Sequence, residues 1–325
     1  MKSAATLASA IATAILTAVS ANATAQAYPT KPIRFFMTAP AASSIDVIGR
    51  IIAEKIKDPL GQAVIVENRV GAGGTIATDA AAKAAPDGYT MVLSFNGPLS
   101  FGPHMYRSLP YDPFKDLAPV ITTTSQPNLL AVSANLPVKS FQELLAYVRK
   151  NQGRLNFGSV GAGSSSHLTM ELLKATAGLY IVHIPFNGSP PAAASLAAGE
   201  TQMMFSVPTA LTPLIQGGKA KAIAVTSLKR YALMPDMPTI AESGLSGFEA
   251  LAWNGVLVPA GTPRPIIDRL NREMNTALKS PDARQKLVGA GLDPVGGTPE
   301  EFARLIRSES DKWAPIIKRT GATVD

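Results

Sequence analysis

The segment Gly163–His167 reads GSSSH and puts hydroxyl groups next to an imidazole. Ser164 or Ser165 together with His167 could form a nucleophile and its base, which is the chemistry of an esterase. The segment lacks the G-x-S-x-G spacing of a nucleophile elbow. The chain has only three His, and His183 lies in an apolar run that favours a structural role. We therefore expect no enzyme and keep the esterase as an alternative.

No motif indicates a metal or a cofactor. The chain has no Cys, which excludes disulfides, thiolate metal ligands and Cys nucleophiles. It has no H-E-x-x-H spacing. Gly71–Gly74 reads GAGG, but the Lys-Ser/Thr of a phosphate loop is missing, and Ile76 stands where a dinucleotide fingerprint needs its third Gly. We interpret this cluster as a tight turn and predict no metal and no cofactor.

Small polar residues gather in four loops that are nearly free of charge: 38–44, 94–97, 159–167 and 206–209. Each follows a predicted strand, and we interpret each as a strand-to-helix junction. A helix N-terminus offers unpaired N–H groups and a partial positive charge, so it binds an anion without Lys or Arg. Capping would explain one such loop, but four at the same end of the sheets indicate a binding site. The candidate ligand-binding residues are Thr38, Ser43, Ser44, Ser94, Asn96, Gly163, Ser164, Ser165, His167 and Ser206.

Alternating strands and helices must position these loops. The first part of the chain predicts a βαβαβ series, which favours a parallel sheet covered on both faces. Its elements are a strand at Ile33–Met37, a helix at Ile45–Ile56, a strand at Val64–Val66, a helix at Thr75–Lys83 and a strand at Thr90–Leu93.

A second series and a helical tail follow. Ser140 and Glu143 predict a capping box at one helix start. We expect an α/β fold of two doubly wound lobes around a central cleft, with ligand at the carboxyl ends of the strands. The predicted strands are Leu129–Ser133, Leu155–Gly158, Ile181–Ile184, Gln202–Phe205, Lys221–Thr226 and Ala250–Val258. The predicted helices are Ser140–Lys150, Ser164–Ala177, Pro190–Ala198, Pro263–Lys279, Asp282–Ala290 and Pro299–Thr320.

The N-terminus has the form of an export signal. Lys2 precedes an apolar stretch, and Ala25-Gln26-Ala27 has the small-x-small form of a cleavage site. The apolar stretch is too short to span a bilayer, which needs about 20 residues. We predict a signal peptide at residues 1–27, cleavage near Ala27 and a periplasmic protein; the alternative enzyme would be a periplasmic esterase.

The net charge of +7 is spread along the chain. Lys2 is the only charged residue in 1–27, and no run of five or more basic residues follows it. Nucleic-acid binding usually needs a basic patch or stripe. We therefore predict no nucleic-acid partner and a solvated basic surface.

An ordered set of motifs covers the mature chain and resembles the Bug family, the periplasmic substrate-binding subunits of tripartite tricarboxylate transporters. Any single motif is weak, whereas the set in this order is specific. The motifs begin at Tyr28 (YPTKPIR), Val66 (VENRVGAGG), Ala85 (APDGYT), Leu109 (LPYDP), Gly163 (GSSSHL), Ala224 (AVTS) and Pro259 (PAGTP).

The resemblance implies a Venus-flytrap protein of the type II periplasmic binding fold. Domain 1 would comprise 28–126 and 253–325, and domain 2 would comprise 127–252. Family members bind organic acids or related small molecules without a metal or covalent cofactor. They hold one carboxylate through backbone groups of two opposed loops and bridging waters, here Thr38–Ser44 and Ser159–His167. The implied partners are membrane permease subunits; a module that reports to a sensor kinase is the alternative.

Two positions depart from the family pattern. The first loop usually contains Pro-Phe-Pro-Pro/Ala-Gly-Gly, whereas this chain has Ala41-Ala42-Ser43 at its end. Loss of both Gly disfavours positive φ, so we expect an altered clamp. Members often carry Asp where Ser206 stands, and its absence argues against an amino-acid ligand.

The expected ligand is an organic acid with one clamped carboxylate, aromatic or short dicarboxylic. The candidate loops contain no Lys or Arg, so N–H and O–H groups must hold the carboxylate. Four aromatic residues lie in or next to the loops, and two of them in the cleft would indicate a flat or apolar ligand body. They are Phe95, Phe157, Phe186 and Phe205.

Overall fold

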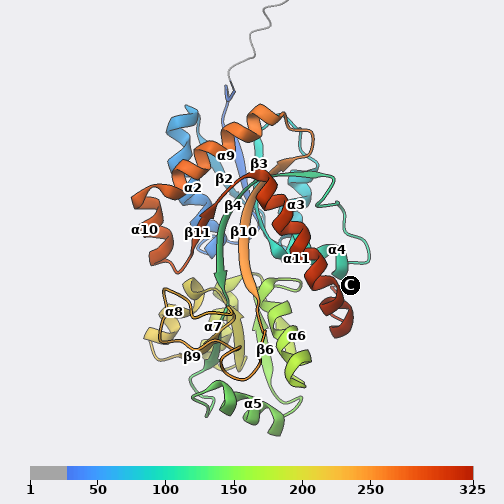
Figure 1. The fold of residues 1–325 in the computed structure, drawn as a ribbon, viewed down its shortest axis with the longest axis vertical. Coiled ribbons are helices and arrows are strands. Elements are labelled where there is room, and N and C mark those ends of the chain that lie inside the picture. Colours follow the sequence, from blue (N-terminus) through green and yellow to red (C-terminus); the bar gives the residue numbers. More distant parts are fainter. Residues whose placement is uncertain (1–27, 325) are drawn as a thin grey trace, which may run out of the picture.

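The computed structural model describes residues 28–324, so the predicted signal peptide, 1–27, lies outside the described part. Two separate β-sheets lie one beyond the other along the long axis of the molecule (Figure 1). Helices pack on both faces of each sheet. We call the part built on the six-stranded sheet the first lobe and the part built on the five-stranded sheet the second lobe. The predicted architecture of two α/β lobes is confirmed.

The sheet of the first lobe is mixed, with strand order β11-β4-β10-β3-β1-β2. β1 pairs in parallel with β2 and β3, whereas β10 is antiparallel to β3 and β4. The parallel pairing predicted for the βαβαβ series is therefore confirmed in β1, β2 and β3. The whole sheet is mixed because β10 arrives from the second lobe and enters the sheet from the opposite end. The strands are β1 (Ile33–Met37), β2 (Val64–Asn68), β3 (Thr90–Phe95), β4 (Leu117–Pro127), β10 (Leu251–Pro259) and β11 (Pro294–Gly296).

The side chains of β1 point alternately to the two faces of this sheet, which explains why helices cover both faces. Phe35 packs with α2 and α9 on one face, and Phe36 packs with α3 and α11 on the other. Successive side chains of a strand point to opposite faces, so a strand that is apolar throughout needs cover on both. The helices are α2 (Ser44–Leu60), α3 (Thr75–Ala82), α4 (Gly102–Met105), α9 (Arg264–Lys279), α10 (Pro281–Gly289) and α11 (Pro299–Thr320), with short η2 (Ala72–Gly74) and η3 (Gly97–Phe101).

The second lobe repeats the same plan in the order β7-β6-β8-β5-β9. β6 is parallel to β7 and β8, and β5 is antiparallel to β8 and β9 because it enters from the first lobe. Leu130 packs toward α5 and α6, and Leu129 packs toward α7 and α8. The elements are β5 (Leu129–Ser133), β6 (Asn156–Ser159), β7 (Val182–Pro185), β8 (Met203–Ser206), β9 (Ala220–Val225), α5 (Phe141–Lys150), α6 (Ser165–Ala177), α7 (Ser189–Ala198) and α8 (Pro208–Gln216).

The chain passes between the lobes at the junction of β4 and β5, and β10 brings it back (Figure 1). Asn128 lies at the first crossing, where its N–H donates to Thr226 Oγ1 at 2.8 Å. Thr226 Oγ1 in turn donates to the carbonyl of Ala250 at the return. These hydrogen bonds tie the two crossing segments together. The domain boundaries 28–126, 253–325 and 127–252 stay a prediction.

The C-terminal helix α11 also touches both lobes. Trp313 on α11 packs against Phe101 of the first lobe, with ring centroids 5.0 Å apart. The same buried cluster contains Leu168 of α6, which belongs to the second lobe. Helix α11 is therefore a third physical link between the lobes, beside β4 and β10.

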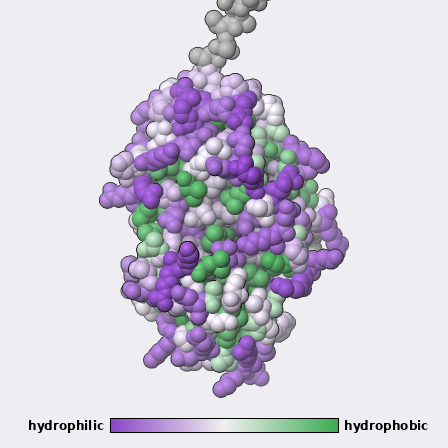
Figure 2. Space-filling model, in the orientation of Figure 1, coloured by the Kyte–Doolittle hydropathy of each residue, from purple (hydrophilic) through white to green (hydrophobic). Residues whose placement is uncertain are grey.

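The surface is largely hydrophilic, with apolar side chains in small groups on the face shown (Figure 2). Among residues 28–324, no helix combines the length and the apolar composition needed to cross a membrane.

The capping box predicted at the start of α5 forms only in part. Ser140 accepts from the N–H of Glu143 at 3.2 Å, but the Glu143 carboxylate accepts from the N–H of Lys139. A full capping box occurs at α11, between Thr298 and Glu301.

Candidate functional site

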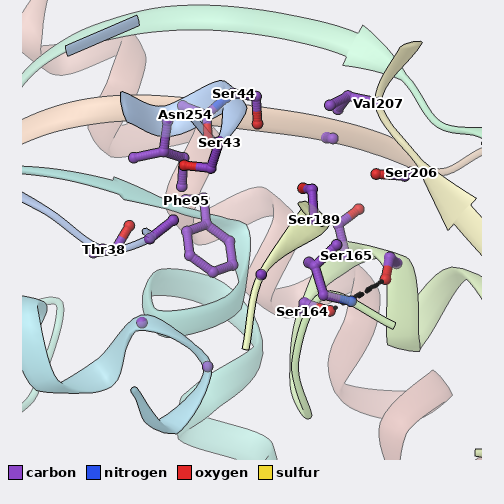
Figure 3. A pocket seen from close by; sticks show the side chains of 18 of the residues that line it. Thr38, Ser43, Ser44, Phe95, Ser164, Ser165, Ser189, Ser206, Val207 and Asn254 are labelled. Atoms are coloured by element: carbon purple, nitrogen blue, oxygen red, sulfur yellow. Dashed lines mark hydrogen bonds between the residues drawn. The ribbon is translucent and has the colours of Figure 1, made fainter. Parts of the chain in front are cut away.

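The carboxyl ends of the parallel strands of both lobes, and the start of β10, face one cleft (Figure 3). All four predicted loops contribute residues to its lining. Among the described residues, the lining contains no Lys, Arg, His, Asp or Glu. The cleft volume is about 90 Å³. At roughly 10–15 Å³ for each water-sized group, this space accepts roughly six to nine such groups, which suits a small ligand.

Five helices begin at the cleft, and the N-cap residue of each lines it. The helices are α2 and α3 from the first lobe and α6, α7 and α8 from the second. Their N-caps are Ser43, Gly74, Ser164, Gly188 and Val207. Each helix start carries a partial positive charge of roughly half an elementary charge. These helix starts therefore favour an anion in the cleft, although no cationic side chain lines it.

Helices α2 and α6 supply the best-placed N–H donors. The Ser43 hydroxyl caps the N–H of Asp46 at 3.3 Å, and the Ser164 hydroxyl caps the N–H of His167 at 3.3 Å. The remaining first-turn N–H groups have no acceptor within their own helix. In α7, by contrast, Pro190 and Pro191 remove two of these donors. The pair of donors on α2 and the pair on α6 come from opposite lobes, at residues 44–45 and 165–166.

The loop before α2 takes the conformation that the missing Gly residues would favour. Ala42 has a φ of 64°, in the left-handed region. Its N–H donates to the Asp46 carboxylate at 3.1 Å. Asn68 donates to both the Ala39 carbonyl and Asp46, each at 2.9 Å. Side-chain hydrogen bonds therefore hold the loop shape at an energetic cost that a Gly would avoid.

Asp46 is a buried carboxylate that stays ionised. It is only 4% exposed, and Arg50 donates to it at 2.9 Å. Burial alone would raise the pKa of Asp46, but the hydrogen bonds from Arg50, Asn68 and the Ala42 N–H outweigh it and hold that pKa below its usual value. The negative charge beside the cleft is thus fully partnered.

The loop before α6 is held by neutral groups. The Ser164 hydroxyl donates to the Gly161 carbonyl at 2.6 Å, and the Ser166 hydroxyl accepts from the N–H of Val160 at 3.0 Å. His167 Nδ1 accepts from the N–H of Gly163 at 3.2 Å. Asn128 donates to the Ser165 hydroxyl at 3.0 Å, which links this loop to the first crossing of the chain.

Most of the predicted site residues lie at the cleft. Ser43 and Ser44 face it from the first lobe, and Ser164, Ser165 and Ser206 face it from the second (Figure 3). Thr38 and Asn96 also line it. Ser94, Gly163 and His167 lie behind the lining, where Ser94 bonds Thr78 and the other two bond each other.

Sequence reasoning missed three parts of the lining. One is the pair of segments that cross between the lobes, with Asn128 and 252–254. Gly71, Gly73 and Gly74, interpreted as a simple turn, line the cleft beside the start of α3. The junction of β7 and α7 contributes Phe186 and Ser189. This junction carries the same signal as the four predicted loops, small polar residues between a strand and a helix.

The lobes already touch across the cleft. A Cβ on Gly73 would collide with the carbonyl oxygen of Ala162, and one on Gly97 would lie 2.8 Å from that of Gly163. A Cβ on Gly188 would lie 2.7 Å from the Pro40 ring. Since real Cβ atoms do not approach this closely, Gly at these positions permits the observed closed arrangement.

Two of the four Phe residues line the cleft. The Phe95 ring projects into it between Thr38 and Ser164 (Figure 3), and Phe186 lines it from the second lobe. Phe157 and Phe205 are fully buried in the core of the second lobe. A flat apolar ligand body can therefore contact aromatic rings from both lobes.

The structure shows no hydrogen bond between the His167 ring and the hydroxyl of Ser164 or Ser165, which the alternative esterase would need. The Ser164 hydroxyl is engaged with the Gly161 carbonyl, and His167 Nδ1 is engaged with the Gly163 N–H. The other ring nitrogen of His167 lies 3.9 Å from Glu171. A general base must be within hydrogen-bond reach of its nucleophile.

Among residues 28–324, no group of three or more His, Asp or Glu is placed to hold a metal ion.

Known proteins match this chain over most of its length. The family model "Tripartite tricarboxylate transporter family receptor" matches residues 48–322. Protein BugT of Bordetella pertussis is 37% identical over 305 residues, which cover 94% of each chain. Two solved structures are similar: R. palustris Rpa4515 with adipate, and MatC (Rpa3494) from Rhodopseudomonas palustris with bound malate. The first is 34% identical with a TM-score of 0.88, covering 91% of this chain and 99% of that one. The second is 32% identical with a TM-score of 0.84, covering 89% and 100%.

Proposed function

This chain belongs to the tripartite tricarboxylate transporter receptor family, and we propose that it captures one small organic carboxylate between its lobes. The observation that carries the proposal is the convergence of five helix N-caps on one uncharged cleft. Aligned N–H groups stabilise an anion there, and a carboxylate with two oxygens can accept from α2 and α6 at once.

The size and lining of the cleft narrow the ligand class. A volume of about 90 Å³ suits a short dicarboxylic or a small aromatic acid. The structural relatives named above contain adipate and malate. Ser206 offers no negative charge to an ammonium group, so amino acids are disfavoured. Sugars are disfavoured because the donors favour an anion.

The role that we propose is binding and delivery without catalysis. It is supported by the solute-binding relatives and by the engaged hydroxyl of Ser164 and ring of His167. Turnover of activated esters that is lost in Ser164→Ala and Ser165→Ala would contradict it. We further propose that the protein presents the ligand to membrane permease subunits of the transporter. Co-purification with a sensor kinase and not with permease subunits would contradict this role and favour a ligand-sensing module.

A thermal-shift screen of organic acids, amino acids and sugars tests the proposed function. A ligand at 100 times its dissociation constant adds about 2.7 kcal/mol to the free energy of unfolding. We expect stabilisation by adipate, malate or benzoate, and none by glutamate or glucose. Stabilisation by amino acids or sugars alone would contradict the carboxylate proposal.

We also propose export to the periplasm with removal of residues 1–27. The family consists of receptors of a transporter, and the Ala25-Gln26-Ala27 pattern supports cleavage. The intact mass of protein recovered from the periplasm should correspond to a chain that starts at Tyr28. A mass that includes Met1 would contradict cleavage.

A further inference from the structure

Three nearly parallel rings lie together behind the loop 159–164, which lines the cleft from the second lobe. His183 on β7 lies against His167 on α6, with centroids 3.9 Å apart and planes 8° apart. Phe157 on β6 lies beside both rings, with its centroid 4.7 Å from that of His183 and 6.2 Å from that of His167, and its plane within 19° of each. His167 is 5% exposed and His183 is half-buried. None of the three rings lines the cleft, yet two of them are bonded to its loop.

The hydrogen bonds define which ring nitrogens carry protons. His167 Nδ1 accepts from the backbone N–H of Gly163, so this nitrogen is unprotonated. The Ser159 hydroxyl contacts His183 Nε2 at 2.6 Å, the Gly161 carbonyl at 3.1 Å and the Gly161 N–H at 3.3 Å. All three contacts are satisfied only when His183 Nε2 donates to the hydroxyl, which then donates to the carbonyl.

Burial and Lys174 oppose a positive charge on the two imidazole rings, whereas the Glu171 carboxylate, 3.9 Å from His167 Nε2, favours one. The charged side chains that face the rings, Lys174 and Glu171, both come from α6 and pair with each other at 2.6 Å. β6 and β7 add only Phe157 and Ser159, which are uncharged. Burial, the neighbouring His183 and Lys174 lower the pKa of His167 to about 3. Burial and Lys174 lower the pKa of His183 to about 4.

We propose that His167 and His183 are positioning residues that, as two stacked neutral rings, hold the loop Ser159–Ser164 in its ligand-binding geometry. The proposal rests on the proposed carboxylate site. The Gly163 and Ser159 hydrogen bonds fix the loop at two points. Its end, Ser164, then starts α6 so that the first-turn N–H groups at 165–166 face the cleft. Loss of either bond frees the loop while the helix itself remains.

Matched substitutions separate the hydrogen bond from the ring. Asn places an acceptor where His167 Nδ1 lies, and Gln places a donor where His183 Nε2 lies. We expect His167→Ala and His183→Ala each to weaken adipate binding about tenfold at pH 7.5, the equivalent of one buried hydrogen bond. His167→Asn and His183→Gln should recover most of that loss. His104→Ala, in the first lobe and bonded to Ser310, should bind as the unmodified protein does.

Two results of this titration calorimetry would overturn the proposal. One is unchanged adipate affinity in both Ala variants. The other is an equal loss in the Ala and the conservative variants while circular dichroism shows all of them folded. Malate replaces adipate as the probe if adipate gives no thermal shift. Absence of binding by either acid to the unmodified protein contradicts the proposed function and leaves the next measurement to decide the inference.

Imidazole NMR of the ligand-free protein tests the ring states directly. We expect both rings as the Nε2–H tautomer at pH 7.5, with protonation only near pH 4 and pH 3. The Gly163 N–H should be protected from exchange at pH 7.5 and lose protection in His167→Ala. An Nδ1–H tautomer at His167, or protonation of either ring near pH 6.5, would overturn the proposal. Because no ligand is present, this result is independent of the proposed function.

Discussion

The two loops that face each other across the cleft are held in opposite ways. The first, 38–44, is anchored by an ionised carboxylate, Asp46, with Arg50 and Asn68 as partners. The second, 159–164, is anchored by the neutral rings of His167 and His183. Both arrangements leave the same feature at the cleft, a Ser N-cap and free N–H groups. Two loops of the same cleft can thus be held in place by different groups, one by an ionised carboxylate and the other by neutral imidazole rings.

The largest effect is expected from Asp46→Ala, which removes the carboxylate that anchors the first loop, 38–44. The substitution leaves the Ala42 N–H and one N–H of the Asn68 amide without their acceptor in a partly buried position and removes the partner of Arg50, so we expect a loss of about 3 kcal/mol in the free energy of unfolding. Urea denaturation at pH 7.5 measures it. Glu54→Ala in the same helix is the control, because Glu54 pairs only with exposed Lys57, and it should unfold at the same urea concentration as the unmodified protein. An equal effect of both substitutions would contradict the anchoring role of Asp46.

Acidification should weaken the second loop before the first. The folded pKa of His167, about 3, lies below its unfolded value of about 6.5, so stability is present above pH 6.5 and is lost as pH falls toward the folded value. The lowered pKa of Asp46 moves its own loss of stability below its ordinary pKa, near 3.8. Between pH 7.5 and 5, His167→Asn should therefore lose about 2 kcal/mol less than the unmodified protein. Parallel pH profiles of the two proteins would contradict this difference.

Contact between the lobes can be tested separately from the loops with Gly73→Ala. Its Cβ would meet the Ala162 carbonyl, so we expect about tenfold weaker adipate binding, which corresponds to about 1.4 kcal/mol. Gly61→Ala is matched in backbone conformation, with φ of 67° against 61°, but has nothing within 4 Å of its Cβ. Both variants should lose similar stability, and only Gly73→Ala should lose affinity. Equal affinities would show that the contact does not limit closure.

The smallest expected effect is at Ala42. Ala in the left-handed region destabilises the folded state by roughly 1–2 kcal/mol, which Gly would avoid. Gly also has more conformational freedom in the unfolded chain, and this offsets part of the stabilisation. Ala42→Gly should therefore raise the free energy of unfolding by only about 0.5 kcal/mol. Thermal unfolding followed by circular dichroism measures it. A lower melting temperature would mean that the bond from Ala42 to Asp46 depends on the stiffer residue.

Apolar periodicity predicted most of the fold, and it failed where polar residues are buried. Strand β4 was missed because its centre, Thr122–Gln126, reads as polar. In the structure, Thr123 donates to the Asn254 carbonyl, and the Asn254 side chain donates to Thr124, so the Thr123, Thr124 and Asn254 side chains have partners inside the sheet. Helix α8 was missed because Pro208 and Pro213 indicate an interruption, yet one lies at its first position.

The candidate site was predictable as far as it depends on strand-to-helix junctions. Ser43, Ser44, Ser164 and Ser165 reach the cleft because a Ser at a junction caps the helix that starts there. The role of Gly73 could not be predicted, because its close neighbour Ala162 lies in the other lobe. Sequence pattern reports on neighbours along the chain, whereas this contact depends on how the lobes meet.

The N–H groups at the starts of α2 and α6 belong to the main chain, and this has an evolutionary consequence. A point substitution can delete a Lys or Arg from a binding site, but only Pro deletes a backbone N–H. Side chains such as Phe95, Phe186, Ser189 and Ser206 can therefore be exchanged one at a time while the donors persist. A lineage can change which acid it recognises without passing through an intermediate that binds none.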